Sequence, residues 1–200
     1  ALFWNTELKS NSIRRSVEVW LLLLALIVLF QAGCSSNYLA ASSKTKVELR
    51  GYWEIESASS DDAQKLLQKE SDNADRGTNL RKEIQRLLRG SGLALVRQEF
   101  GVLSADTMSI EADQFSFGFD YEPGTYRDVS LGRRDRGIWK VYSGWDSDVF
   151  TVDSTSLDIR VVERYLIEAK GKLIVEFMVR ADGNKVELKR VFTRRSQARG

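Results

Sequence analysis

The sequence predicts a mainly β domain, an antiparallel up-and-down (lipocalin-like) barrel or a strongly curved sheet, with a helical insert after the first strand. Apolar and polar residues alternate through most of the chain beyond residue 92, which indicates strands with one buried face. Tight turns rich in Gly, Pro, Asn and Asp separate these segments, as in a series of hairpins. The stretch 61–89 instead has apolar residues at helical spacing. A sandwich shares these features, but sequential hairpins favour the barrel.

Residues 1–33 have the three-part pattern of a secretory signal. Arg14 and Arg15 precede an apolar run from Val19 to Phe30, and small residues follow it, as in signal peptides. The run is shorter than the roughly 20 apolar residues of a transmembrane helix. The sequence is also consistent with an alternative start codon at Leu8, in which case residues 1–7 are read from upstream sequence.

A lipid anchor is predicted at the end of this run. Ala32-Gly33-Cys34 resembles the lipobox of bacterial lipoproteins, in which the cysteine is diacylated and becomes the new N-terminus. The resemblance implies lipidation of Cys34 and the membrane as a partner, since two or three acyl chains hold a protein essentially permanently. Because Ser35 rather than Asp follows, it also implies the outer membrane, with the domain facing the periplasm. The alternative is an uncleaved signal anchor.

The remaining chain divides into a linker, a β domain and a short tail. Residues 34–46 are small and polar, which predicts a flexible linker. The β domain spans 47–195 and begins with a strand at 47–56. Acidic residues at 61 and 62 are suited to the start of the helical insert, which is expected at 61–89. Residues 196–200 are expected to form a basic tail. The further strands are expected at 107–110, 114–121, 125–131, 138–142, 149–152, 157–167, 173–180 and 185–194.

Composition argues against several functional classes. The chain has no His and one Cys, so it lacks the commonest general base and any Cys-rich metal site. Its net charge is +2 and the part after the signal is nearly neutral, which argues against a nucleic-acid partner. Asp146, Asp148 and Asp153 lack the ligand spacing of a Ca²⁺ loop. We therefore expect no enzyme, no cofactor and no metal.

One strand carries four aromatic residues at a spacing of two. Phe115, Phe117, Phe119 and Tyr121 are expected on a single face. Such a face is usually part of the core. In a barrel it can also line a site for a small apolar or ring-containing ligand, and Trp139 is expected to join that lining.

A second set of residues is expected at the surface. Tyr142 precedes the expected turn at 144–148 and Trp145 lies in it, and exposed aromatic rings there would suit a partner surface. The segment 132–137 is expected to be a charged loop that could contact anionic headgroups or acidic groups of another protein. Its arginines are Arg133, Arg134 and Arg136.

The two ends of the β domain resemble those of lipocalins. Gly51-Tyr52-Trp53 opens the first strand and Arg190-Val-Phe-Thr-Arg194 closes the last. Lipocalins begin with a Gly-x-Trp strand and end with an Arg that packs across that Trp. The resemblance implies a structural pair of Trp53 with Arg194, or else Arg190, that closes the barrel by a cation–π contact.

A closer likeness is to uncharacterised exported bacterial proteins with lipocalin-like barrels. It covers about residues 47 to 195 and rests on short motifs, which indicate a fold more than a function. Besides Trp53, these motifs are Ser60-Asp61-Asp62, Gly144-Trp145-Asp146 and Val191-Phe192-Thr193-Arg194.

The leading hypothesis is a membrane-tethered, non-enzymatic module of the bacterial cell envelope that binds a small apolar ligand in the barrel. The alternative is an accessory subunit of an envelope assembly, which would bind a protein partner through its exposed aromatic residues and arginines. A hydrolase would need two acidic residues that converge in a cleft without a basic residue to neutralise them.

Overall fold

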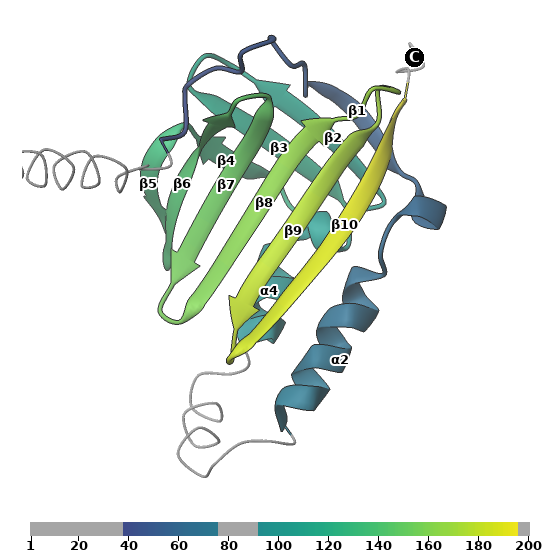
Figure 1. Cartoon of the computed structure of the whole chain (residues 1–200), viewed down its shortest axis with the longest axis vertical. Helices are drawn as coiled ribbons and strands as arrows, with labels where there is room; N and C mark the ends of the chain where they lie inside the picture. Colours follow the sequence, from purple (N-terminus) through teal and green to yellow (C-terminus); the bar gives the residue numbers. More distant parts are fainter. Residues whose placement is uncertain (1–37, 76–91, 196–200) are drawn as a thin grey trace, which may run out of the picture. The chain divides into compact units, whose positions relative to one another are not determined.

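The computed structural model describes residues 38–75 and 92–195 (Figure 1). The predicted signal, Cys34, residues 76–89 of the insert and the basic tail lie outside these residues. Residues from Leu39 onward belong to one compact unit. Among the described residues, no helix has the length and apolar character required to cross a membrane.

Ten antiparallel strands form one sheet with the order β4-β3-β2-β1-β10-β9-β8-β7-β6-β5. Each strand pairs with its neighbour in sequence except β4 and β5, and the first strand pairs with the last. The predicted up-and-down antiparallel arrangement is confirmed. The strands are β1 (Gly51–Ile55), β2 (Thr107–Ala112), β3 (Ser116–Glu122), β4 (Arg127–Ser130), β5 (Gly132–Arg136), β6 (Trp139–Asp146), β7 (Val149–Ser156), β8 (Ile159–Ile167), β9 (Leu173–Ala181) and β10 (Asn184–Arg195).

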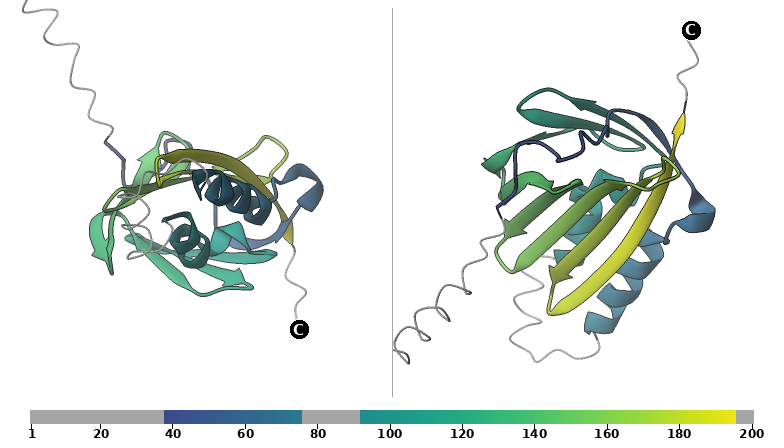
Figure 2. Two further views of the ribbon diagram at one scale, coloured as in Figure 1. Left: turned by 90° about the horizontal axis from the view of Figure 1, so that it is seen from below. Right: turned by 45° about the horizontal axis from the view of Figure 1, so that its top comes forward.

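The sheet curls into a nearly closed barrel (Figure 2). Its two edge strands, β4 and β5, are joined by the single residue Leu131. At this corner the Ser143 hydroxyl donates a hydrogen bond to the Ser130 carbonyl over 2.6 Å, which ties β6 to the end of β4. We call the two unpaired edges, Arg127–Ser130 and Gly132–Arg136, the seam.

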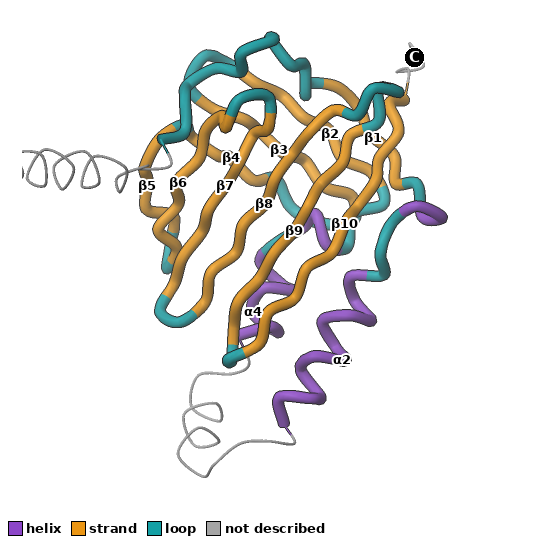
Figure 3. The backbone as a smooth tube through the Cα atoms, in the orientation of Figure 1, coloured by secondary structure: helices purple, strands orange, loops and turns teal. Residues whose placement is uncertain are grey.

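The helical segments gather at one end of the barrel, which we call the helix end (Figure 3). They comprise η1 (Ser57–Ser59), α2 (Ala63–Asp75), α4 (Gly92–Glu99) and η2 (Gly101–Leu103). Asp62 caps α2, because its Oδ1 accepts a hydrogen bond from the Lys65 backbone N–H over 3.0 Å, as predicted for an N-cap. At the start of α4, an added Cβ on Gly92 would lie 3.1 Å from the Cβ of Ala181. Helix α4 therefore lies very close to the β9–β10 hairpin.

The opposite end is covered by the segment before β1. Ala40 and Trp145 exchange two backbone hydrogen bonds of 2.8 Å, and the Thr45 N–H donates to Asp148 Oδ1 over 2.9 Å. Leu49 is buried. Residues 39–46 were expected to form a flexible linker. That expectation is wrong for this stretch, since it is hydrogen-bonded to the β6–β7 hairpin.

Three other elements differ from the sequence predictions. The charged segment 132–136 is strand β5 rather than a loop. Strand β6 continues through Gly144 to Asp146, so the turn is shorter than expected. Residues 92–99, where the predicted insert had ended, form helix α4. Alternating residues of the strands and the inner faces of the helices make one apolar core, so the helices are part of the core rather than an appendage.

Candidate functional site

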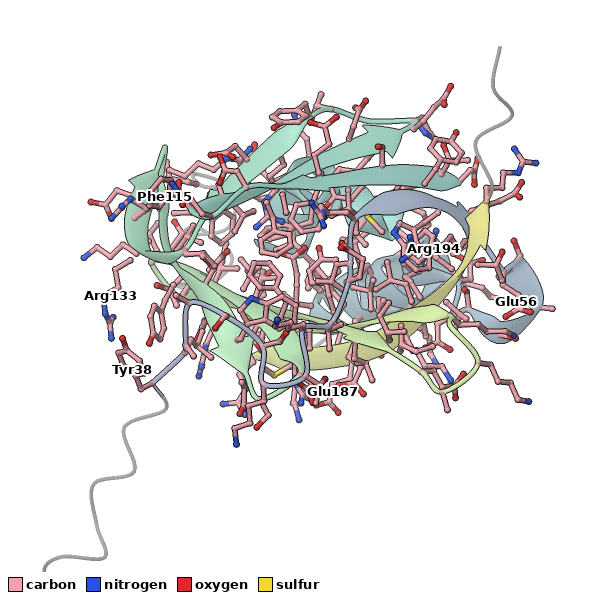
Figure 4. The ribbon with its side chains drawn as sticks, turned by 90° about the horizontal axis from the view of Figure 1, so that it is seen from above. Tyr38, Glu56, Phe115, Arg133, Glu187 and Arg194 are labelled. Atoms are coloured by element: carbon pink, nitrogen blue, oxygen red, sulfur yellow. The ribbon has the colours of Figure 1, made fainter. Side chains whose placement is uncertain are left out.

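The aromatic strand β3 places three of its four predicted residues inside the barrel. Phe117, Phe119 and Tyr121 are buried. Phe115 is 68% exposed and lies at the periphery of the molecule (Figure 4), so its predicted place in the lining is wrong. The Asp113 carboxylate accepts the backbone N–H groups of Phe115 and Ser116, each at 2.7 Å. This turn holds Phe115 before the strand begins, where the alternation does not apply.

The inward-facing rings of β3 pack directly on rings from the opposite side of the barrel. The centroids of Phe117 and Phe150 lie 4.3 Å apart, and those of Phe119 and Tyr165 lie 5.0 Å apart. Trp145 completes the group, 5.4 Å from Phe150. These rings form an aromatic cluster inside the barrel, in which the rings contact one another directly.

A buried ion pair lies beside the aromatic cluster. Arg127 Nη1 donates to Glu163 Oε2 over 2.6 Å, and these side chains are only 4% and 0% exposed. The hydroxyl of Tyr165 donates to Glu163 Oε1 over 2.8 Å, and the hydroxyls of Tyr121 and Tyr165 are 3.3 Å apart. Buried charges are tolerated when they are paired and hydrogen-bonded in this way.

Burial and charge determine how these groups ionise. Burial, followed by the charge of the nearby Glu163 carboxylate, raises the pKa of Tyr121 well above its ordinary range. The same two causes raise the pKa of Tyr165. Burial, the largest single influence, lowers the pKa of Arg127, but the charge and hydrogen bond of Glu163 together with Tyr121 and Tyr165 outweigh it, and the pKa is raised. At neutral pH the phenols of Tyr121 and Tyr165 and the guanidinium of Arg127 are therefore all protonated.

Phe100, directly after α4, connects this ion pair to Trp139. The guanidinium carbon of Arg127 lies 4.9 Å from the centroid of the Phe100 ring, and the Trp139 ring is 5.2 Å from Phe100 in an edge-on arrangement. Arg127 Nε and Trp139 Nε1 are both buried and have no acceptor among the described residues. Both side chains that carry these unpartnered N–H groups thus contact the Phe100 ring. We call Phe100, Arg127 and Trp139 the donor site.

The predicted partner surface is only partly present. Trp145, expected to be exposed, is buried because β6 runs on past Gly144 and turns this side chain inward. Tyr142 is half-buried, and its hydroxyl accepts the Leu39 N–H over 2.7 Å. The guanidinium of Arg133 stacks on its ring at 4.5 Å. Arg134 and Arg136 are exposed, on a strand rather than in the expected loop.

The predicted contact between Trp53 and Arg194 is present. The guanidinium carbon lies 4.4 Å from the Trp53 ring, and Figure 4 shows Arg194 between β1 and β10. Its Nη atoms donate to the carbonyls of Arg50 and Glu48 at 2.8 and 3.0 Å. A Cβ on Gly51 would lie 2.6 Å from Arg194 Nη1, and the φ of Gly51 is +136°, so only glycine fits here. Arg190 is not the partner of Trp53, since it donates to Leu103 and Ala105.

Sequence reasoning missed Arg127, Glu163 and Phe100. A signal for the two charged residues was present in the alternation: Arg127 precedes Val129 by two positions, and Glu163 lies between Val161 and Tyr165 in the same register. A charged residue at an inward position of a strand points to an interior ion pair or site. Phe100 carries no comparable signal, because its position depends on helix α4.

Within 38–75 and 92–195, no three His, Cys, Asp or Glu side chains group as metal ligands. The buried carboxylate, Glu163, is neutralised by Arg127. A hydrolase would need acidic residues that no basic residue neutralises, and Glu163 does not meet that condition.

A scan against protein-family models and a search of curated proteins gave no match. Among solved structures, the fold is similar to the fluorescent protein UnaG, with a TM-score of 0.47 and 19% identity over 74% of this chain and 97% of UnaG. It is also similar to lipid binding protein 8 of Caenorhabditis elegans, with a TM-score of 0.47 and 15% identity over 78% of this chain and all of that protein.

Proposed function

We propose that this domain is a non-enzymatic binding module that takes a small, largely apolar ligand into the barrel at the donor site. One observation carries the proposal. Arg127 Nε and Trp139 Nε1 are buried without acceptors, next to Phe100 and close to an interior otherwise lined by aromatic rings. A ligand with an apolar body and one acceptor group matches both features.

The two unpartnered donors, Arg127 Nε and Trp139 Nε1, are unfavourable in a closed interior. A buried N–H without an acceptor destabilises a fold by about 1–3 kcal/mol, so buried donors in proteins are nearly always paired. An ordered water needs two to four polar partners. The apolar surroundings of Trp139 Nε1, next to Phe100, favour an acceptor carried by a ligand over a solitary water.

The membrane tether forms the second part of the proposal. We propose that Cys34 is diacylated and that the barrel is held in the bacterial cell envelope, at the outer membrane and facing the periplasm. The support comes from the sequence: the tripartite signal and Ala32-Gly33-Cys34. The barrel has its own core from Leu49 onward, so the tether need not contribute to folding.

Native mass spectrometry of the full-length protein, gently extracted from its own membrane, tests both parts. We expect a mass that starts at Cys34 and carries acyl chains, together with a retained small molecule. Trp139→Phe keeps an aromatic side chain but removes the indole N–H donor, and should release most of that molecule. An intact N-terminus without acyl mass would contradict the tether, and a lipidated but empty barrel would contradict the ligand.

The alternative, an accessory subunit of an envelope assembly, has one observation in its favour. Outside the barrel, Arg133 stacks on the half-buried Tyr142 and presents a cation and an aromatic ring on one surface. If the extracted protein is empty and a specific envelope protein is bound to it, and Tyr142→Ser releases that protein, this alternative replaces the ligand proposal.

A further inference from the structure

Strand β5 has an inner face that the core does not cover. In the β5–β6 ladder, Arg134 lies opposite Val141 and Arg136 opposite Trp139. Val141 and Trp139 are buried in the interior, and residues opposite one another in a ladder point to the same face. Arg134 and Arg136 therefore project from the inner face of the sheet, yet both are exposed.

The charges on the strands around the seam are sorted between the two faces. Asp128 and Asp135 lie opposite Gly118 and Lys140, and Asp146 follows the inward-facing Trp145. All three acids are exposed and fall in the outward register. Because successive side chains of a strand point to opposite faces, β4 and β5 place arginines on the inner face around the seam, and β4, β5 and β6 place all of their acidic residues on the outer face.

Two of these inner-face arginines have no counter-charge among the described residues. Arg127 is neutralised by Glu163. Within the described part of the chain, neither Arg134 nor Arg136 forms an ion pair; the one side-chain hydrogen bond of Arg134 goes to the Arg133 carbonyl over 2.9 Å. A pair of unneutralised cations beside a low-dielectric interior concentrates anions locally.

The seam also adjoins the donor site. Arg127 is the first residue of β4, and Trp139 lies opposite Arg136 at the end of β5. The two ends of the barrel are covered by the chain itself, one by α2 and α4 and the other by residues 39–49. The seam is the place where neighbouring strands share no ladder.

Building on the proposed function, we infer that the ligand is an anion, an apolar molecule bearing one carboxylate or similar oxyanion, and that it passes through the seam by way of Arg134 and Arg136. The exposed guanidinium groups receive the anionic end, which then reaches the donor site. Charged residues also protect the edges of sheets from aggregation. That simpler role predicts that ligand binding does not depend on these two residues.

Stopped-flow binding by the full chain in lipid nanodiscs tests the inference, with empty nanodiscs as the blank. The probes are 11-(dansylamino)undecanoic acid and its uncharged primary amide. Arg134→Gln/Arg136→Gln should slow association of the acid about tenfold and flatten its dependence on salt, without changing binding of the amide. The matched control, Arg133→Gln/Lys140→Gln, removes two cations from the outer face of the same strands and should leave both probes unaffected.

Each outcome separates the inference from the function on which it rests. If the acid binds the inner-face variant as fast as the wild type, or the control variant slows it equally, the seam inference is overturned while ligand binding stands. If neither probe binds the wild type, the proposed function itself fails. Circular dichroism and thermal melting of both variants verify that they remain folded, as expected for substitutions of exposed side chains.

Discussion

Breaking the interior ion pair should destabilise the barrel far more than breaking a surface pair at the same distance. The attraction between Arg127 and Glu163 across 2.6 Å is about 6 kcal/mol at an effective dielectric constant of about 20. Desolvation of the two buried ions offsets much of this. Removal of one partner, however, leaves the other charge buried alone. Arg127→Met and Glu163→Gln should each lower the free energy of unfolding by about 3–5 kcal/mol.

The double variant provides the decisive comparison. Arg127→Met/Glu163→Gln removes both charges while the Gln carbonyl still accepts from Tyr165, so the loss should be smaller than either single loss. Denaturant unfolding followed by tryptophan fluorescence measures the coupling, which we expect to exceed about 2 kcal/mol.

Arg164 and Glu176, paired at 2.6 Å but 44% and 48% exposed, provide the matched control. Their coupling should stay below about 1 kcal/mol. Equal coupling energies for the two pairs would refute the conclusion that burial determines how much stability is lost when an ion pair is broken.

Further predictions concern the aromatic residues and the tyrosines. Phe119→Ala should cost about 3–5 kcal/mol of stability, because it opens a cavity in the core, whereas Phe115→Ala should cost less than about 0.5 kcal/mol; equal losses in thermal melting would contradict the assigned sides of β3. Arg194→Gln removes the cation from the Trp53 ring and should cost about 1 kcal/mol, measured by denaturant unfolding, with Arg195→Gln as the neighbouring control. The raised pKa values of Tyr121 and Tyr165 mean that the folded state holds these protons more tightly than the unfolded chain, whose phenols ionise near pH 10. Their contribution is therefore present below about pH 10 and lost above it; ultraviolet titration should show two of the six tyrosines ionising only on unfolding, and six tyrosines ionising together in the folded protein would refute this.

The alternation of residues was sufficient to predict the barrel but not all of its strands. Strand β3 was recognised because Phe117 and Phe119 alternate with small or polar residues. Strand β5 was missed because neither of its faces is buried, so Arg133, Arg134 and Arg136 show no hydrophobic period. Periodicity reports burial, and a strand without a buried face leaves no such signal.

The candidate site was predictable only in part, for a different physical reason. Trp139 was expected in the interior from its own strand pattern, and it lies there. The donor site also needs Arg127, which faces Glu163 from 36 positions away, and Phe100, which depends on a helix that the pattern did not indicate. Alternation tells which way a side chain points, but not which strand lies across the barrel from it.

The contact between the first and last strands has a consequence for how the chain folds. The hydrogen bonds from Arg194 to the carbonyls of Arg50 and Glu48 join residues 144 and 146 positions apart. During synthesis, the β1 edge therefore stays unpaired on that side until β10 has emerged. Contacts over such distances slow folding, because the loop must close before they form. A chain cut short before β10 should expose the edges of β1 and β9 and aggregate, so the twelve residues of β10 control the solubility of the domain.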